Sequence, residues 1–117
     1  MTDIIYETQE NFYQYIQRVV EGASTIADYL REDKIGEAMQ LIVQFSEGVS
    51  WLTQVIVLMR EHRYYIDIDP SKINKFFVEI NEGLERQDYV ITADMFEYEI
   101  QPFFEEIKEK RFKKVGE

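Results

Sequence analysis

Apolar residues recur at alternating intervals of three and four along most of this chain. The first such stretch runs from Ile5 to Leu30, the second from Ile35 to Met59, the third from Ile73 to Leu84, and the fourth from Tyr89 to Ile107. A spacing near 3.5 residues keeps these side chains on one side of a helix, and it is typical of antiparallel bundles. The pattern therefore predicts four amphipathic helices around one core.

Residues with helix-capping side chains mark where the first two helices begin. The first helix begins after Thr2 or Thr8 and runs to about Arg31, and Asp33 is predicted to cap the second, which continues to about Arg63. Only two or three residues separate the two helices, so they must lie antiparallel. The second stretch contains many β-branched residues, but its unbroken helical period decides against a buried strand.

Alternating residues precede the third helix. Residues 64–68 are predicted to cross the bundle end in an extended conformation that buries Ile66 and Ile68, and Asp69 with Pro70 then begins a short third helix. Asp88 caps the fourth helix, in which Pro102 lies away from the apolar stripe and is expected to bend the axis. The predicted fold is an all-α, antiparallel, up-down-up-down four-helix bundle.

The composition fits one domain over residues 1–117. The chain is 45% hydrophobic and contains 17 aromatic residues, which is typical of a globular core. It has no cysteine, no apolar run near the roughly 18 residues of a membrane span, and no basic start of a signal peptide. We therefore expect a cytoplasmic protein without a membrane partner.

The charge is acidic and uneven. The chain has a net charge of −10, although five of the seven residues from Lys108 to Lys114 are basic. Nucleic acid is not an expected partner, because phosphate binding needs a broad basic face. We interpret the basic residues as favourable charges at the negative end of the last helix dipole; a basic ligand for the acidic part is the alternative.

Few residues suggest catalysis. His62 is the sole histidine, so the Glu-x-x-His pairs of di-iron bundles cannot form. The lack of cysteine and of a second histidine argues against nucleophilic triads, and no glycine-rich phosphate loop is present. No catalytic residue, cofactor or metal is predicted. The enzymatic alternative is a phosphotransfer domain in which His62 accepts a phosphoryl group. Such domains resemble one another in having a lysine and a glycine after the histidine, whereas Arg63 and Tyr64 follow His62 here.

The second predicted helix is apolar nearly all round. Trp51, Val55 and Leu58 lie on a side well rotated from the stripe, at about 100° per residue. In one interpretation this helix is the covered centre of the bundle. In the other, these three residues form a surface for an amphipathic helix or a second subunit. Tyr15 and Tyr29, at the stripe margin of the first helix, are further candidates for partner binding.

Two resemblances support a binding role. The segment from Asp94 to Glu106 resembles part of a family of small helical proteins of unknown function from Gram-positive, clostridia-like bacteria, and the likeness extends over most of the chain. The residues Glu21-Gly22-Ala23 and the stretch from Asp33 to Ile42 are similar to flagellar export chaperones of the FliS type. The first resemblance implies no catalytic residues, and the second implies a chaperone-like role.

The sequence therefore predicts a non-enzymatic bundle that binds another protein, as an adaptor or chaperone-like module. Its abundance of apolar helix surface and shortage of catalytic groups favour this function. A purely homo-oligomeric structural protein is the remaining alternative beside phosphotransfer.

Overall fold

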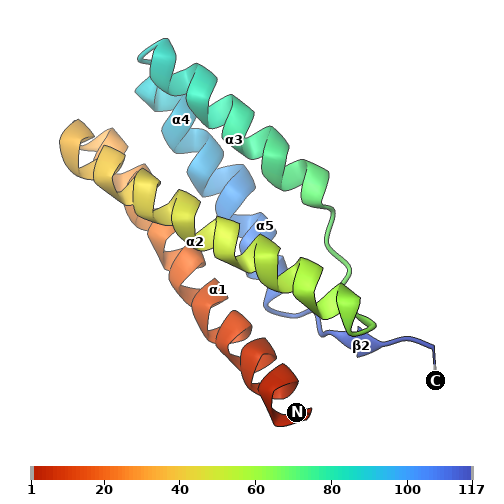
Figure 1. Ribbon diagram of the computed structural model, residues 1–117. Helices are drawn as coiled ribbons and strands as arrows, with labels where there is room; N and C mark the ends of the chain where they lie inside the picture. The colour runs from red at the N-terminus through yellow and green to blue at the C-terminus, as the bar shows by residue number, and fades with distance from the viewer. Residues whose placement is uncertain (1, 117) are drawn as a thin grey trace.

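Four helical segments run alternately up and down in a bundle that measures 51 × 22 × 20 Å (Figure 1). The computed structural model describes residues 2–116, and Met1 and Glu117, the ends of the predicted domain, lie outside the described residues. The elements are α1 (Thr2–Arg31), α2 (Ile35–Glu61), β1 (Tyr64–Tyr65), α3 (Pro70–Glu85), α4 (Tyr89–Met95), η1 (Phe96–Ile100), α5 (Gln101–Ile107) and β2 (Lys113–Lys114). The predicted all-α four-helix fold is confirmed, with α4, η1 and α5 together forming the fourth helix.

The two tight turns between helices close in the same way. Asp33 and Gln87 both adopt left-handed backbone conformations, with φ of 60° and 55°, directly after a helix end. In the first turn the Lys34 N–H donates to the carbonyl of Tyr29 at 2.9 Å, and an equivalent bond closes the second. Such bonds satisfy the last carbonyls of a helix. The predicted capping role of Asp33 is therefore wrong: Asp33 belongs to the end of α1, and Lys34 precedes α2 without a side-chain cap.

The other two predicted caps are confirmed. The hydroxyl and the backbone N–H of Ser71 donate to the Asp69 carboxylate at 2.6 and 3.0 Å, and Pro70 occupies the first turn of α3. These two hydrogen bonds lower the pKa of Asp69, the hydroxyl contributing more. The Asp88 carboxylate accepts the N–H of Ile91 at 3.2 Å at the start of α4. Local sequence therefore fixes both helix starts.

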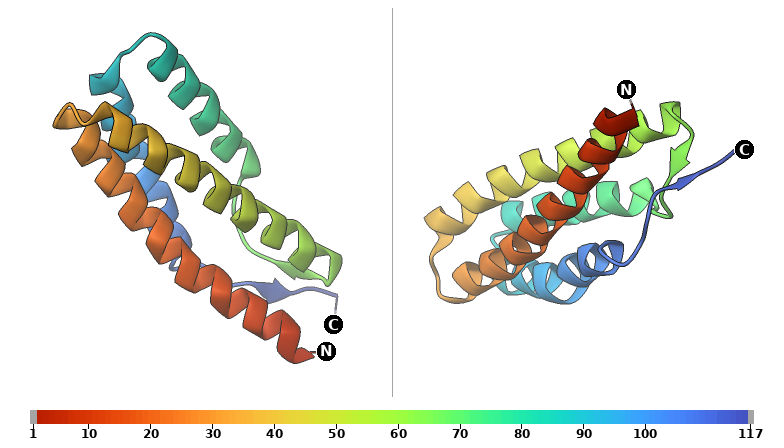
Figure 2. Two further views of the ribbon diagram at one scale, coloured as in Figure 1. Left: turned by 60° about the vertical axis from the view of Figure 1, so that its left-hand side comes forward. Right: turned by 90° about the horizontal axis from the view of Figure 1, so that it is seen from below.

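The core lies along α1. The predicted stripe of α1 is buried from Phe12 to Leu30, and that of α2 is buried from Ala38 to Met59. In the view from below, α1 lies between α2 and the fourth helix (Figure 2). Because α3 packs on α4 and scarcely approaches α2, the central helix is α1. The interpretation of α2 as the covered centre of the bundle is therefore wrong, since one of its sides lacks a covering helix.

A π-helical turn precedes Pro102. In η1 the N–H of Gln101 donates to the carbonyl of Phe96, five residues earlier. Pro102 has no N–H, and its ring would crowd the carbonyl four residues earlier in an α-helix, so the wider turn accommodates it. The extra residue shifts the phase of the apolar stripe. Phe104 is therefore fully buried, whereas Phe103 is half-buried, although its place three residues after Ile100 and four before Ile107 in the fourth apolar stretch predicts it for the core.

The basic C-terminal segment crosses the lower end of the bundle (Figure 2). Its strand β2 pairs antiparallel with β1, Tyr64 opposite Lys114, and the predicted burial of Ile66 and Ile68 is confirmed. Phe112 packs against Phe12 with ring centroids 5.1 Å apart. From the sequence, the basic residues are interpreted as favourable charges at the end of the last helix. This interpretation holds for Lys108 alone, because α5 ends at Ile107 and residues 109–116 form a non-helical segment, here called the C-terminal strap.

Candidate binding surface on α2

Large apolar side chains are exposed along α2. Their exposed fractions range from 36% to 58%, and they are Trp51, Met39, Leu58, Val57 and Val43 in rising order. Between Ala38 and Met59 the sequence has one charged residue, Glu47. Contiguous apolar surface of this kind marks interaction sites on soluble proteins.

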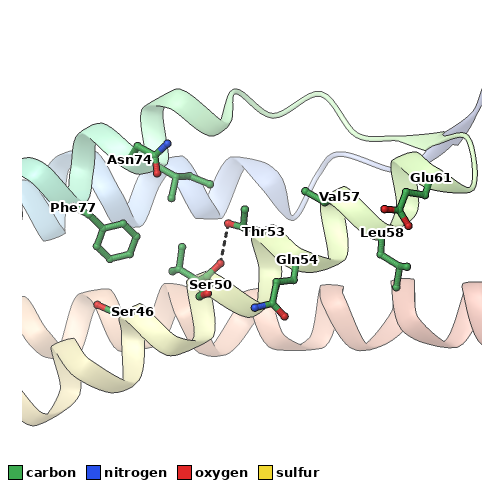
Figure 3. Close-up of a pocket in the computed structure, with 11 residues that line it drawn as sticks. Ser46, Ser50, Thr53, Gln54, Val57, Leu58, Glu61, Asn74 and Phe77 are labelled. Atoms are coloured by element: carbon green, nitrogen blue, oxygen red, sulfur yellow. Dashed lines mark hydrogen bonds between the residues drawn. The ribbon is translucent and has the colours of Figure 1, made fainter.

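A groove separates α2 from α3 along the open side of the bundle (Figure 3). Its volume is about 490 Å³. The α2 side chains that line it lie on one face of the helix, and the α3 side chains come from its first two turns: Ser46, Val49, Ser50, Thr53, Gln54, Val57, Leu58, Glu61, Ile73, Asn74 and Phe77. The groove exists because the fourth seam of the bundle stays open, while α1 closes against α2 and against the fourth helix.

The α2–α3 groove is apolar and nearly neutral. Two of its three hydroxyl groups bond to their own helix: Ser46 donates to the carbonyl of Ile42 at 2.9 Å, and Thr53 donates to that of Val49 at 3.0 Å. Their donors are therefore satisfied without a ligand. At the side of the groove, the ring of Phe77 lies 6.3 Å from that of Phe45, which belongs to the core. What remains open to a ligand is mostly hydrocarbon.

A second interhelical hollow gives a useful contrast. Between α3 and the fourth helix, a hollow of about 360 Å³ is lined by eight residues, of which five are charged: Lys72, Lys75, Glu79, Glu99 and Glu106. Glu61 is the single charged residue in the lining of the α2–α3 groove. Three of the charged residues of α3, Lys72, Lys75 and Glu79, thus lie on its far side, so the neutrality of the α2–α3 groove follows largely from the rotation of α3 about its axis.

The predicted binding residues do not form one surface. Trp51 and Tyr15 come together across α1 and α2, with ring centroids 5.4 Å apart, in a shallow hollow of about 650 Å³ lined otherwise by polar side chains and Gly48. Leu58 belongs to the α2–α3 groove instead. The structure therefore divides the predicted set between two sides of α2.

Two of the predicted residues do not join either hollow. Val55 is buried, with 4% of its surface exposed, so its proposed part in a binding surface is wrong. It faces α1 because it lies about 60° from the buried stripe residue Leu52, within the arc that α1 covers. Tyr29 is half-buried near the top of α1, where the Lys34 ammonium lies 5.5 Å from its ring centre.

The sequence reasoning missed Ser50 and Val57, which line the groove on α2. Together with exposed Val43 above the groove they recur every seven positions, so the three lie on one line of the helix surface. That recurrence was a usable signal. It was hidden because a seven-residue line of small and branched residues also suits a buried helix face.

His62 lies at the lower end of α2. It is exposed and occupies the C-cap position, where its backbone N–H donates to the carbonyl of Met59 at 3.0 Å and the N–H of Arg63 donates to that of Arg60 at 2.9 Å. Among the described residues, no three histidine, cysteine or acidic side chains are placed to hold a metal ion. Phosphotransfer through His62 stays a prediction.

Helix α2 contradicts the expectation that no segment of the chain could span a membrane. Within the described chain, α2 is the one helix that is long and apolar enough to span a membrane by length and composition, with a mean hydropathy of 1.4 over its best window. The expectation that no segment meets this test is therefore wrong. Of that window, 39% is buried within the bundle, and buried helices of globular proteins pass the same test.

The fold and the groove together define an all-α four-helix bundle with one open seam. A family model described as a domain of unknown function, DUF8042, matches residues 7–110, and the chain belongs to this family. No curated protein and no solved structure matches the chain.

Proposed function

We propose that this protein is a non-enzymatic, chaperone-like adaptor that binds another protein through the exposed side of α2. The observation that carries the proposal is the open α2–α3 seam, because an acidic chain with a net charge of −10 keeps this groove nearly uncharged and apolar. A surface that only faces water would favour charged residues, because they keep a protein soluble better than apolar residues do.

The energetics support binding by burial. Full burial of a valine or leucine side chain stabilises a complex by roughly 1.5–3 kcal/mol, so covering half-exposed Val43 and Val57 contributes about 1 kcal/mol each. Trp51, in the separate α1–α2 hollow, is a second candidate contact of the aromatic type that anchors many interfaces. The proposal keeps the expected cytoplasmic location, which suits a chain without cysteine.

The test compares two pairs of substitutions that change the net charge equally. Val43→Lys with Val57→Lys places cations on the exposed side of α2, whereas Val90→Lys with Val115→Lys changes valines on α4 and the C-terminal strap that are at least as exposed as Val57. We expect a partner captured from the native lysate to be lost by the first variant and kept by the second. Identical partner sets for both variants and the wild type would contradict the proposal.

A purely homo-oligomeric protein makes a different prediction. In that case the mass in solution of the purified wild-type chain is a multiple of 14.1 kDa, and the α2 variant returns it to the monomer. Light scattering on the purified protein separates the two functions.

A further inference from the structure

The α2–α3 groove has the dimensions of a helix site. Its lining on α2 extends from Ser46 to Glu61, which corresponds to about 22 Å, or a partner helix of about 15 residues. The groove lies between two antiparallel helices of a bundle whose other neighbouring helices are in contact. A helix that lies along this seam would complete the packing as a fifth element, with apolar residues at every third or fourth position facing Val57, Ile73 and Phe77.

The charges around the groove select among such helices. No basic side chain lines the groove, and its charged lining residue is Glu61; Arg60 precedes Glu61 outside the lining. On the helical lines of the groove, the next charged residues are Glu47 and Arg60 on α2 and Glu85 on α3, all exposed, so with Glu61 three carboxylates stand against one cation. The rim is thus acidic, and the chain as a whole has a net charge of −10. A helix with lysine or arginine beside its apolar stripe is attracted by both, whereas a second copy of this acidic chain is repelled.

We infer that the α2–α3 groove binds an amphipathic helix of a partner protein, with an apolar stripe of about four turns flanked by basic residues. This inference rests on the proposed function and names the chemistry of its partner. The apolar stripe of the partner helix provides affinity for the groove. Its basic flanking residues provide the preference over helices with acidic flanks.

The test uses synthetic peptides and the purified full chain. The first probe is a peptide of about 15 residues with leucine at every third or fourth position and lysine elsewhere on the flanks. The second replaces every lysine by glutamate, and neither peptide contains tryptophan. Calorimetry is expected to show binding of the lysine peptide, at least about tenfold weaker binding of the glutamate peptide, and a loss of affinity as salt rises.

A matched pair of variants locates the site. Ser50→Arg places a long cation in the middle of the groove, and Ser24→Arg makes the same change at an exposed position of α1 outside every hollow described above. Both variants change the net charge equally. We expect Ser50→Arg to weaken binding of the lysine peptide by about tenfold or more and Ser24→Arg to leave it within about twofold. Equal effects of the two variants would overturn the assignment to the groove.

Trp51 provides an independent readout, because it is the sole tryptophan and belongs to the hollow between α1 and α2. Binding in the α2–α3 groove is expected to leave its emission nearly unchanged, while a large change would place the peptide beside Trp51 and overturn the inference. Equal binding of both peptides would overturn the basic preference. A doubled mass at high protein concentration would show that a second copy of the chain occupies the groove. Binding to neutral lipid vesicles that Ser50→Arg abolishes would show that the groove binds a membrane surface. Either result would overturn the inference.

The two proposals fail in different ways. If Val43→Lys with Val57→Lys removes the captured partner but Ser50→Arg does not, the inference about the groove is wrong and the adaptor function stands. If neither change alters the captured proteins, the proposed function itself is wrong.

Discussion

The hydroxyl oxygen of Tyr15 on α1 lies 2.5 Å from the position that a Cβ atom would occupy at Gly48 on α2. Two carbon atoms of the same ring lie within 2.9 Å of that position, so the ring occupies the space that a side chain would need. Trp51 packs edge-on against Tyr15 and limits how far the ring can withdraw. The two longest helices thus approach closely at a glycine.

Gly48→Ala is therefore expected to destabilise the protein. Alanine alone favours a helix by about 1 kcal/mol over glycine, but forcing the Tyr15 ring aside costs more, so we expect a net loss of about 1–2 kcal/mol. Urea denaturation measures it. In a Tyr15→Ala background the loss should disappear, because the obstructing ring is gone; the same loss in both backgrounds would contradict the contact.

Gly22→Ala should have the opposite effect. Gly22 also lies inside a helix and also follows a glutamate, yet a Cβ atom there meets nothing within 4 Å. We expect Gly22→Ala to raise the free energy of unfolding by roughly 0.5–1 kcal/mol, measured by the same denaturation.

The π-helical turn before Pro102 predicts unequal effects of two neighbouring phenylalanines. Phe104→Ala removes a fully buried ring and should cost about 3–5 kcal/mol, whereas Phe103→Ala removes a half-buried one and should cost roughly 1 kcal/mol. The losses in the free energy of unfolding of the two variants are measured by thermal and urea denaturation. The reverse order would indicate an ordinary α-helix through this segment.

Phe112 and its neighbour Arg111 hold the C-terminal strap against α1. The Phe112 N–H donates to the Tyr13 hydroxyl at 3.0 Å, and the Phe112 ring packs on Phe12. The Arg111 guanidinium lies 4.8 Å from the Tyr13 ring centre. Phe112→Ala is expected to release the strap and lower stability by about 1–2 kcal/mol. Hydrogen exchange should then speed up at the N–H of Val115, which bonds to the carbonyl of Arg63, while amides in the middle of α1 keep their protection.

Asp69 predicts a pH dependence of stability. Its pKa is lowered from the ordinary 3.8 by the hydrogen bonds from Ser71, so the ionised cap contributes stability above that pH and loses it as pH falls through the folded-state pKa. Asp69→Asn keeps a capping oxygen without this titration. We expect the difference in Tm between wild type and variant to be constant near neutral pH and to shrink below about pH 4. A constant difference into strong acid would contradict this role.

The sequence by itself determined the elements of this protein, because their causes are local. Apolar periodicity placed the helices, Asp69 and Asp88 fixed two of their starts, and short turns imposed the antiparallel path. It failed at Asp33, since a left-handed turn residue is usually glycine and an aspartate there resembles a cap. It failed at Phe103 because the π-helical turn adds one residue and rotates the next turn, so that Phe104 takes the buried place, while Ile107 stays buried.

Only the tertiary structure decided which apolar residues of α2 are covered. Periodicity alone cannot distinguish Val55, which α1 buries, from Val57, which borders the open groove, because burial depends on where another helix lies. The distance of α3 from α2 follows from its packing on α4, a relationship between segments far apart in the chain. The candidate binding site is therefore a property of helix placement, and local sequence does not specify it.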